Sequence, residues 1–386
     1  METGRASGAG VSRPASQAVG LFLMTNTFET GGSERQFAIL AQNLAPEEFQ
    51  VHLGCIRRIG PFANDFGPVP EFRLGGSLYG WKSLTTRLRL SRHLRANGVQ
   101  IAHAFDFYTN LTLIPAARLA RVPVVIGSQR QLGDLLTPAQ FRAQAAVFRW
   151  CDAVVCNSRA AADRLEAHGL SRDKLLVIGN GLPEEAFIAA PEAAHHLRGT
   201  MCVGMVARMN ARYKNHSGFL RIAARVQQHF PQIDFLLAGD GPLRKELEQE
   251  ARNLGLGKHV FFLGDRRDMN AVLASMDVAV LTSDSESLSN VILEAMAAGL
   301  PVVAYDVGGN REIVSEKYGV LVPRGDEEGF ATAVERLLTA PELRKGMGRA
   351  AHAFVQENFS LSRVRRRYED LYEDLLKKKG RRNPAR

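Results

Sequence analysis

The chain has 386 residues and an ordinary globular composition, with 45% hydrophobic and 23% charged residues, so it is long enough for roughly two domains. Its net charge of +9 is uneven: residues 1–180 carry 20 basic and 13 acidic side chains, residues 181–362 carry 19 and 23, and residues 363–386 carry 10 and 4. Aromatic stacking platforms and nucleic-acid reading modules are lacking, which argues against nucleic-acid binding. The basic segments favour an anionic membrane surface or an anionic acceptor, with a merely solvated basic face as the alternative.

The start of the chain and the cysteines bear on where the protein acts. Residues 1–18 are small and polar and lack the apolar core of a signal peptide, so we expect a flexible leader. No segment approaches the roughly 18 uninterrupted apolar residues of a membrane-spanning helix. The four cysteines form no Cys-x-x-Cys pair and adjoin apolar patterns, which predicts buried free thiols. We therefore expect a cytoplasmic protein that can associate peripherally with the inner face of the membrane.

Two glycines follow the first apolar run. Val19–Asn26 has the length of a strand, and Gly31 and Gly32 precede an apolar-periodic helix. That helix is expected to begin at Ser33, whose spacing to Gln36 is that of a capping box. Paired glycines let a backbone approach a ligand closely, and they leave helix N–H groups facing it. A ligand loop is one interpretation, and a tight turn with positive φ is the other.

Strands and helices alternate through the rest of the first half, which predicts a parallel doubly wound sheet. Ligands of such sheets bind at the carboxyl ends of the strands. Polar side chains gather at these ends: His103, Asp106, Asn157 and Asn180. Because imidazole also satisfies buried carbonyl groups, a structural role is the alternative for His103.

A second alternating series begins at Met201, after a proline-interrupted stretch that we interpret as a linker over residues 183–200. The first strand of this series ends at Arg208, and Lys214 comes just before the next helix. Arginine offers a planar fork of donors and lysine a compact point charge. This pair of cations suits a leaving diphosphate.

A glycine-rich loop at residues 239–242 follows the next strand of this series. It superficially resembles a dinucleotide fingerprint, with Gly239 and Gly241 as the first two glycines. The third position that needs glycine is Arg244, so a dehydrogenase is poorly supported.

The stretch Ser283–Pro301 carries two carboxylates, Glu286 and Glu294. Apolar residues fill positions 291–298, and Gly299 supplies a left-handed end, which predicts a short buried helix. A carboxylate inside such a helix needs a hydrogen-bonding partner. Glu294 should lean back toward Glu286 and the N–H groups at the helix start, where a nucleotide-sugar would find both acceptors and donors. Two charges at a solvated helix start are the alternative.

Taken in order, these residues resemble glycosyltransferase family 4, the retaining enzymes with a GT-B fold, over nearly the whole chain after the leader. The matching segments are GGSE at 31–34, His103, CNS at 156–158, NG at 180–181, VGMVAR at 203–208 with Lys214, GDGP at 239–242, FLG at 262–264, the paired glutamates, and GGNRE at 308–312.

The resemblance implies an α/β fold of two facing Rossmann-like domains with a carboxy-terminal helix that crosses back to the first. Residues 19–182 would form the acceptor domain and residues 201–360 the donor domain. Residues 361–379 would be the crossover helix, and residues 380–386 a basic tail.

The resemblance also implies roles for individual residues. Glu294 would bind the ribose, Glu286 would face the donor sugar, and Arg208 and Lys214 would stabilise the departing diphosphate. His103 would contact the donor sugar or help to position the acceptor. Further donor-site residues would be Gly31, Gly32, Gly239 and the main-chain N–H groups of Leu288, Ser289 and Asn290. No metal or other cofactor is expected. The family's usual glycine or aromatic positions after the first glutamate are Ser287 and Leu288 here, so the sugar stays open.

The leading hypothesis is a glycosyltransferase of cell-envelope polysaccharide biosynthesis. It would move a hexosyl or N-acetylhexosaminyl group from a nucleoside diphosphate sugar to a lipid-linked or polysaccharide acceptor at the cytoplasmic membrane face. A sugar-nucleotide epimerase, a glycogen-synthase-like GT-B enzyme and a non-catalytic nucleotide-sugar binding protein are the alternatives.

Overall fold

The computed structural model describes residues 18–78, 80–188 and 201–382. The expected leader therefore lies outside the described residues apart from Ala18, as do residues 189–200 of the expected linker and the last four residues of the tail. Among the described residues, the helices are all too short or too polar to span a bilayer.

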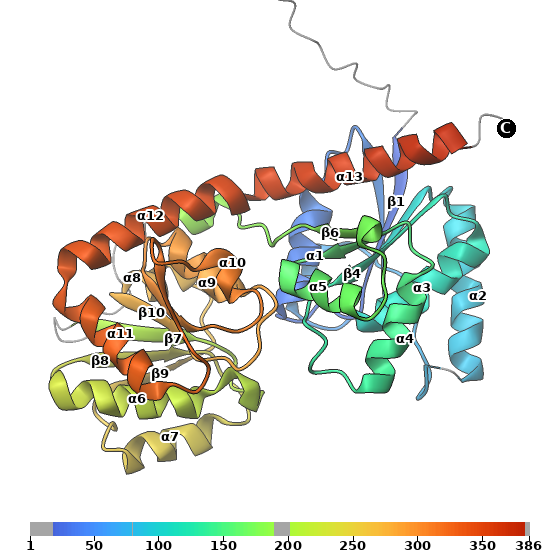
Figure 1. The fold of residues 1–386 in the computed structure, drawn as a ribbon. Helices are drawn as coiled ribbons and strands as arrows, with labels where there is room; N and C mark the ends of the chain where they lie inside the picture. Colours follow the sequence, from blue (N-terminus) through green and yellow to red (C-terminus); the bar gives the residue numbers. More distant parts are fainter. Residues whose placement is uncertain (1–17, 79, 189–200, 383–386) are drawn as a thin grey trace, which may run out of the picture. The chain divides into compact units, whose positions relative to one another are not determined.

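Each half of the chain builds a six-stranded sheet with parallel pairing, as the alternating pattern predicts (Figure 1). The first sheet has the order β2-β1-β3-β4-β5-β6, and the second has the order β12-β11-β10-β7-β8-β9. The strands of the first sheet are β1 Val19–Thr25, β2 Phe49–Cys55, β3 Ile101–Ala104, β4 Val124–Gln129, β5 Ala153–Cys156 and β6 Leu175–Val177. Those of the second are β7 Cys202–Val206, β8 Asp234–Ala238, β9 Val260–Gly264, β10 Val278–Leu281, β11 Val302–Tyr305 and β12 Gly319–Val322.

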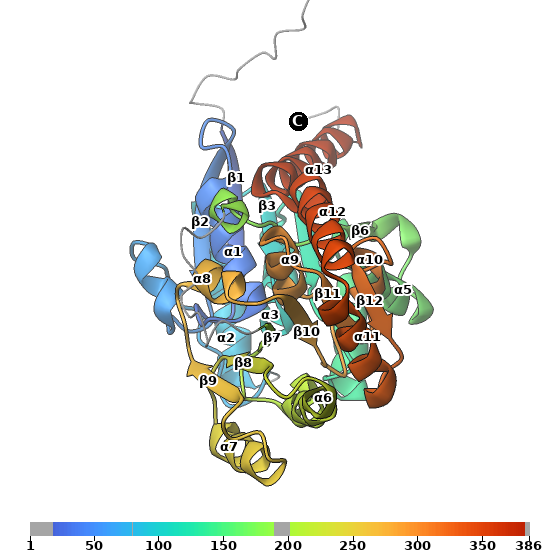
Figure 2. The ribbon, with the colours of Figure 1, turned by 90° about the vertical axis from the view of Figure 1, so that its left-hand side faces the viewer.

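Helices follow most of the strands. In the first half they are α1 Gly32–Asn43, α2 Trp81–Ala96, α3 Phe107–Ala120, α4 Pro138–Phe148 and α5 Arg159–Ala167. In the second half they are α6 His216–His229, α7 Arg244–Asn253, α8 Met269–Ala274, α9 Asn290–Ala297, α10 Asn310–Ile313, α11 Glu327–Thr339, α12 Pro341–Phe359 and α13 Leu361–Arg382. Helices α6 and α11 pack side by side near the second sheet, as both ribbon views show (Figure 1, Figure 2).

The chain divides into two compact units. The first comprises the described residues through Ser128, Arg142–Val154 and the chain from Glu369 onward; the second comprises Gln129–Phe141 and Val155–Tyr368. The last part of α13 thus belongs with the first sheet, where the Tyr372 ring contacts Phe49 and His103. In the second unit the core is formed by the strands and by the inward faces of α6, α9 and α11.

Local details differ from the expectations at two helix ends. Helix α1 begins at Gly32 rather than Ser33, with Gly31 as N-cap and without a side-chain cap, so the expected capping box is wrong. Gly31 is extended, with φ −71°, and the tight turn with positive φ is not formed there. Helix α13 runs to Arg382, three residues beyond its expected end, because the lysine-rich segment continues the helix.

Candidate active site

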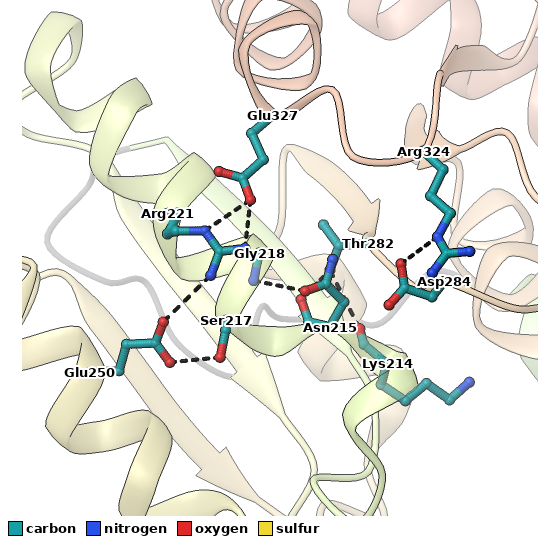
Figure 3. Close-up of polar contacts among 10 residues, drawn as sticks. All are labelled: Lys214, Asn215, Ser217, Gly218, Arg221, Glu250, Thr282, Asp284, Arg324 and Glu327. Carbon is teal, nitrogen blue, oxygen red and sulfur yellow. Dashed lines mark hydrogen bonds and ion pairs between the residues drawn. The ribbon is translucent and has the colours of Figure 1, made fainter.

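The backbone around Lys214 is held to the second sheet by its neighbours. After the short 3-10 turn Arg212–Lys214, Asn215 adopts the left-handed conformation and caps α6 through the Gly218 N–H, at 3.1 Å from its Oδ1. The Thr282 hydroxyl, directly after β10, donates to the Asn215 carbonyl at 2.9 Å (Figure 3). Left-handed backbone is unusual for a residue other than glycine. The cap and the Thr282 contact stabilise it and so determine where Lys214 leaves the sheet edge.

The Lys214 side chain pairs with Glu286. Its Nζ donates to Glu286 Oε1 at 2.6 Å, and the two side chains are only 22% and 10% exposed. A largely buried carboxylate needs such a partner, because burial removes its hydration. Arg208, the other predicted cation, follows β7 by two residues and is exposed.

Helix α9 has the buried carboxylate that its sequence predicts. Ser289 is the N-cap, and its hydroxyl accepts the Ile292 N–H at 3.3 Å. Glu294 is 9% exposed in the middle of the helix. Gly299, just after the helix, has φ +78°, the expected left-handed end. Whether Glu294 leans toward Glu286 stays a prediction.

The residue after Glu286 is tied to the CNS segment at 156–158. The Ser287 hydroxyl donates to Asn157 Oδ1 at 2.6 Å, and it lies 3.0 Å from the Ser158 hydroxyl. Ser287, Asn157 and Ser158 are all buried. The sequence marks Ser287 only as a departure from the family pattern, and its role here is to connect the Glu286 loop to the end of β5.

A second tie starts from the NG segment at 180–181. Asn180 donates through Nδ2 to Asn290 Oδ1 at 2.5 Å, and Arg130 donates to Asn180 Oδ1 at 2.5 Å. Asn290 is the first residue of α9. The helix start that is predicted to hold the diphosphate is therefore anchored by two residues that are distant in sequence.

The GGNRE segment at 308–312 contacts the backbone of Glu286 and Ser287. The Gly309 N–H donates to the Glu286 carbonyl at 3.1 Å. A Cβ on Gly308 would lie 1.9 Å from that carbonyl oxygen, and one on Gly309 would lie 1.7 Å from the Ser287 oxygen. Glycine is needed at both positions because two backbones meet.

Glu312, at the end of that segment, caps α5. Its Oε2 accepts the Arg159 N–H at 2.8 Å, and its Oε1 accepts the Ala160 N–H at 2.9 Å. These are N–H groups of the first helical turn, which have no partner within the helix. The sequence shows Glu312 only as a family match, and its capping contact could not be assigned without the fold.

The predicted donor-site residue Gly239 approaches the Arg208 segment closely. It has φ +130°, and a Cβ there would lie 2.2 Å from the Ala207 carbonyl oxygen. Gly241 is likewise pressed against Met209, with φ +153°. Both glycines let the loop after β8 lie against the chain at Ala207–Met209, beside Arg208.

His103, Gly31 and Gly32 belong to the other unit. His103 lies on β3, with register partners Leu23 and Ile126, and is fully buried. Its Nδ1 lies 2.8 Å from the Tyr372 hydroxyl and its Nε2 lies 2.8 Å from the Ser128 hydroxyl. The imidazole therefore connects three elements of that unit: β3, β4 and α13.

Asp106 follows β3 and caps α3. Its carboxylate accepts the Asn26 N–H at 2.7 Å and the Thr109 N–H at 3.1 Å. Burial raises the pKa of Asp106 to about 6, although the backbone donors of Thr109 and Asn26 oppose the rise; nearby Glu34 adds to it.

The cysteines are buried and free, as predicted. Burial raises the pKa of the Cys55 and Cys156 thiols to about 12, so neither is a ready nucleophile. In the part of the chain that the structure describes, no three histidine, cysteine or acidic side chains are grouped to hold a metal ion.

Both halves of the chain match glycosyltransferase family models. The family model "Glycosyltransferase Family 4" matches residues 30–186, and "Glycosyl transferases group 1" matches residues 200–340. The lipopolysaccharide core biosynthesis glycosyltransferase LpsE of Rhizobium meliloti is 32% identical over 250 residues, which is 64% of this chain and 69% of LpsE. An Escherichia coli enzyme named UDP-Gal:alpha-D-GlcNAc-diphosphoundecaprenol alpha-1,3-galactosyltransferase is 25% identical, covering 86% of this chain and 91% of that protein.

The fold has a solved counterpart. Anabaena HepE in complex with UDP superposes with a TM-score of 0.82 at 22% identity, over 92% of this chain and 100% of that one. The two parallel sheets and this likeness establish the GT-B fold. With LpsE alike over two thirds of its length, the chain belongs to the family 4 glycosyltransferases.

Proposed function

We propose that this glycosyltransferase moves a sugar, with retention at the anomeric carbon, from a nucleoside diphosphate sugar to a lipid-linked or polysaccharide acceptor of the cell envelope. The observation that carries the proposal is the Lys214–Glu286 pair. It sets a cation and a carboxylate side by side, immediately before a helix start that leads to a second buried carboxylate, Glu294.

In the proposed reaction, the site has to stabilise a leaving diphosphate. Lys214 and Arg208 would supply positive charge, and the N–H groups of Leu288, Ser289 and Asn290 would supply aligned donors at the amino-terminal end of α9. Donors fixed before the reaction act where charge develops and need no reorganisation. The anchors at Ser287 and Asn290 support this role, because they fix the segment that carries the donors.

Two carboxylates complete the proposed donor site. Glu294 would accept hydrogen bonds from the ribose hydroxyls, and Glu286 would face the donor sugar. When a diphosphate binds, Lys214 would share its charge between Glu286 and the phosphate.

For the remaining residues we propose supporting roles. Gly31 and Gly32 would close over the donor, and Gly239 would let its loop approach it. His103, held by Tyr372 and Ser128, would position the acceptor or the donor sugar rather than act as a base. Residues 19–182 would form the acceptor domain and residues 201–360 the donor domain. No metal ion is assigned to the reaction.

Three relatives support the substrate classes by their names. LpsE is named for the lipopolysaccharide core, the Escherichia coli enzyme for UDP-galactose and a diphosphoundecaprenol acceptor, and HepE was solved with UDP. We infer a uridine diphosphate donor and an acceptor presented at the cytoplasmic face of a membrane.

The test is a thermal-stability screen with UDP, GDP and ADP, followed by a panel of sugar donors with the preferred base. A ligand that binds the folded state at a hundredfold excess over its Kd stabilises the protein by about 2.7 kcal/mol. UDP should therefore raise Tm, and GDP and ADP should not. Transfer to a lipid-diphosphate acceptor, with the product's anomeric configuration determined by NMR, should then show retention. Conversion of a donor to its epimer without acceptor would support the epimerase instead, and the absence of both binding and transfer would refute the proposal.

A further inference from the structure

Helix α2 buries hydroxyl groups and exposes large apolar side chains. Ser83, Thr86 and Ser91 are among its buried residues. The Ser83 hydroxyl donates to the Ser77 carbonyl at 2.6 Å, and the Thr86 hydroxyl donates to the Arg73 carbonyl at 2.8 Å. On the solvent side, Trp81 is 78% exposed, Leu84 46% and Leu88 39%. Leu90 and Leu94 are buried on the same side as Ser83 and Thr86, so that side faces the core. Trp81, Leu84 and Leu88 therefore form a second apolar side, which faces solvent.

The three exposed apolar residues share one side of the helix. Positions 81, 84 and 88 follow the i, i+3, i+7 spacing, which brings side chains onto one face. A single exposed leucine needs no explanation, but a contiguous patch that includes a tryptophan marks an interaction surface.

The same helix is basic throughout. Residues 81–96 include Lys82, Arg87, Arg89, Arg92 and Arg95 and no acidic residue. Arg87 and Arg95 donate to carbonyls of α3, and Arg89 donates to the Glu71 carbonyl. Lys82 and Arg92 are exposed. Arg92 lies eleven residues after Trp81, about three helical turns, and is therefore on the same side of the helix.

We propose that the α2 surface, defined as Trp81, Lys82, Leu84, Leu88 and Arg92, docks the protein on an anionic membrane. Tryptophan and leucine enter the interfacial layer, and lysine and arginine meet the negative headgroups. The helix carries cations and no carboxylate, so its charge is complementary to an anionic lipid surface. The inference rests on the proposed function in one respect: a lipid-linked acceptor places the reaction at a membrane.

The α2 surface is better suited to this contact than the basic carboxy-terminal helix. In α13, Lys379 pairs with Asp152 at 2.5 Å and Lys377 with Glu373 at 2.7 Å, so carboxylates offset two of its lysines. α13 also lacks an exposed tryptophan, since the chain's two are Trp81 and Trp150.

These two tryptophans make a matched pair of reporters. In Trp150→Phe the tryptophan fluorescence comes from Trp81, and in Trp81→Phe it comes from Trp150. Trp150 is 54% exposed and lies outside α2. Each variant is titrated with vesicles of phosphatidylcholine alone and of phosphatidylcholine with 30% phosphatidylglycerol. Trp81 emission should shift to the blue with the anionic vesicles and be quenched by brominated lipid. Trp150 emission should stay unchanged.

Flotation assays then measure the contribution of each kind of side chain. Trp81→Ser/Leu84→Ser should lower the vesicle partition coefficient about tenfold or more, because large apolar surfaces leave the interface. Lys82→Gln/Arg92→Gln should lower it by up to about 25-fold, at about fivefold for each cation. The control Lys345→Gln/Arg349→Gln removes the same charge from exposed positions of α12 and should change binding little.

Three outcomes overturn the proposal: no vesicle binding by the wild-type protein, unchanged binding in both α2 variants, or an equal loss in the α12 control. Nucleotide-induced thermal stabilisation is measured on every variant in vesicle-free buffer. It should match wild type, because the α2 surface is not part of the donor site. If nucleotides do not stabilise the wild-type protein either, that result contradicts the proposed function and not the docking surface.

Discussion

Lys214 and Glu286 join two loops of the second sheet that lie 72 residues apart in sequence, through a 2.6 Å contact between Nζ and Oε1. The pair is largely buried, so the attraction between the two charges has to compensate for the hydration that each loses. In the proposed reaction the same lysine meets the leaving diphosphate. The ion pair therefore links stability of the site to its chemistry.

Replacing either proposed cation should slow transfer. Lys214→Ala and Arg208→Ala should each lower turnover roughly a hundredfold or more, as for the loss of one charge-stabilising donor. Steady-state kinetics with saturating donor measures this. Lys214→Ala should also lower the free energy of unfolding by about 1–3 kcal/mol, because Glu286 is left unpaired. Arg208 is exposed, so Arg208→Ala should leave the free energy of unfolding unchanged.

The control for that pair is Arg212→Ala. Arg212 is in the same 3-10 turn as Lys214 but pairs with Glu246 at the surface. Turnover by Arg212→Ala should equal that of the wild type. Wild-type rates in both Lys214→Ala and Arg208→Ala would remove these residues from the mechanism.

Glu294 should recognise the ribose. Glu294→Gln should weaken binding of the preferred nucleoside diphosphate by about tenfold or more, because a hydrogen bond to a charged group contributes about 1.5–3 kcal/mol. The 2′,3′-dideoxy analogue lacks the hydroxyls and should bind both proteins alike, to within about twofold by calorimetry. Equal weakening for the two nucleotides would contradict ribose recognition and indicate a packing defect.

Gly309 should tolerate no side chain. Gly309→Ala would force the Ser287 carbonyl away, since a Cβ would lie 1.7 Å from it, and we expect lower stability and strongly reduced kcat/KM. Gly346 is a helical glycine in α12 with open space around its Cβ position. Gly346→Ala should instead stabilise by about 0.5–1 kcal/mol with unchanged activity. Thermal unfolding of both variants checks the contrast.

Glu312 should act by positioning. Removing its carboxylate leaves two N–H groups of α5 without their cap, which should lower stability by about 0.5–2 kcal/mol. Glu312 follows Gly309 by three residues, and the Gly309 N–H donates to the Glu286 carbonyl. The Glu286 loop should therefore loosen as well, and a small displacement should lower kcat by roughly tenfold to a hundredfold. The nucleotide Kd of Glu312→Ala should stay near that of wild type. Exposed Glu316→Ala is the control, and a change in Kd without a change in kcat would contradict the positioning role.

Asp106 should make stability depend on pH. Its pKa rises from the ordinary 3.8 to about 6 in the folded state, so the folded protein binds this proton more tightly than the unfolded chain. The contribution of this group to the free energy of unfolding is therefore largest at low pH and falls as pH rises from about 4 to about 6. The difference between wild type and Asp106→Asn, measured by urea unfolding, should decline over that window and be constant above pH 7. A flat difference across the window would show that Asp106 does not titrate there.

The alternation of strand and helix patterns predicted both parallel sheets, and the apolar run around Glu294 predicted its burial. Such features depend on periodicity within a few residues, which a sequence displays directly. Arg208 and Lys214 could be placed near a strand end for the same reason. The capping box at Ser33 failed because local spacing does not decide where a helix begins.

Only the tertiary structure decided which distant residues contact the Glu286 loop and the start of α5. Ser287 meets Asn157 across 130 residues and Glu312 reaches α5 across about 150, and no local pattern encodes such pairs. Helix α2 makes the same point: it carries apolar residues on two opposite sides, and only the fold shows that Leu90 and Leu94 are buried whereas Trp81, Leu84 and Leu88 are exposed. On the buried side, Ser83 and Thr86 donate to carbonyl groups of the preceding segment, and those contacts exist only once the chain has folded.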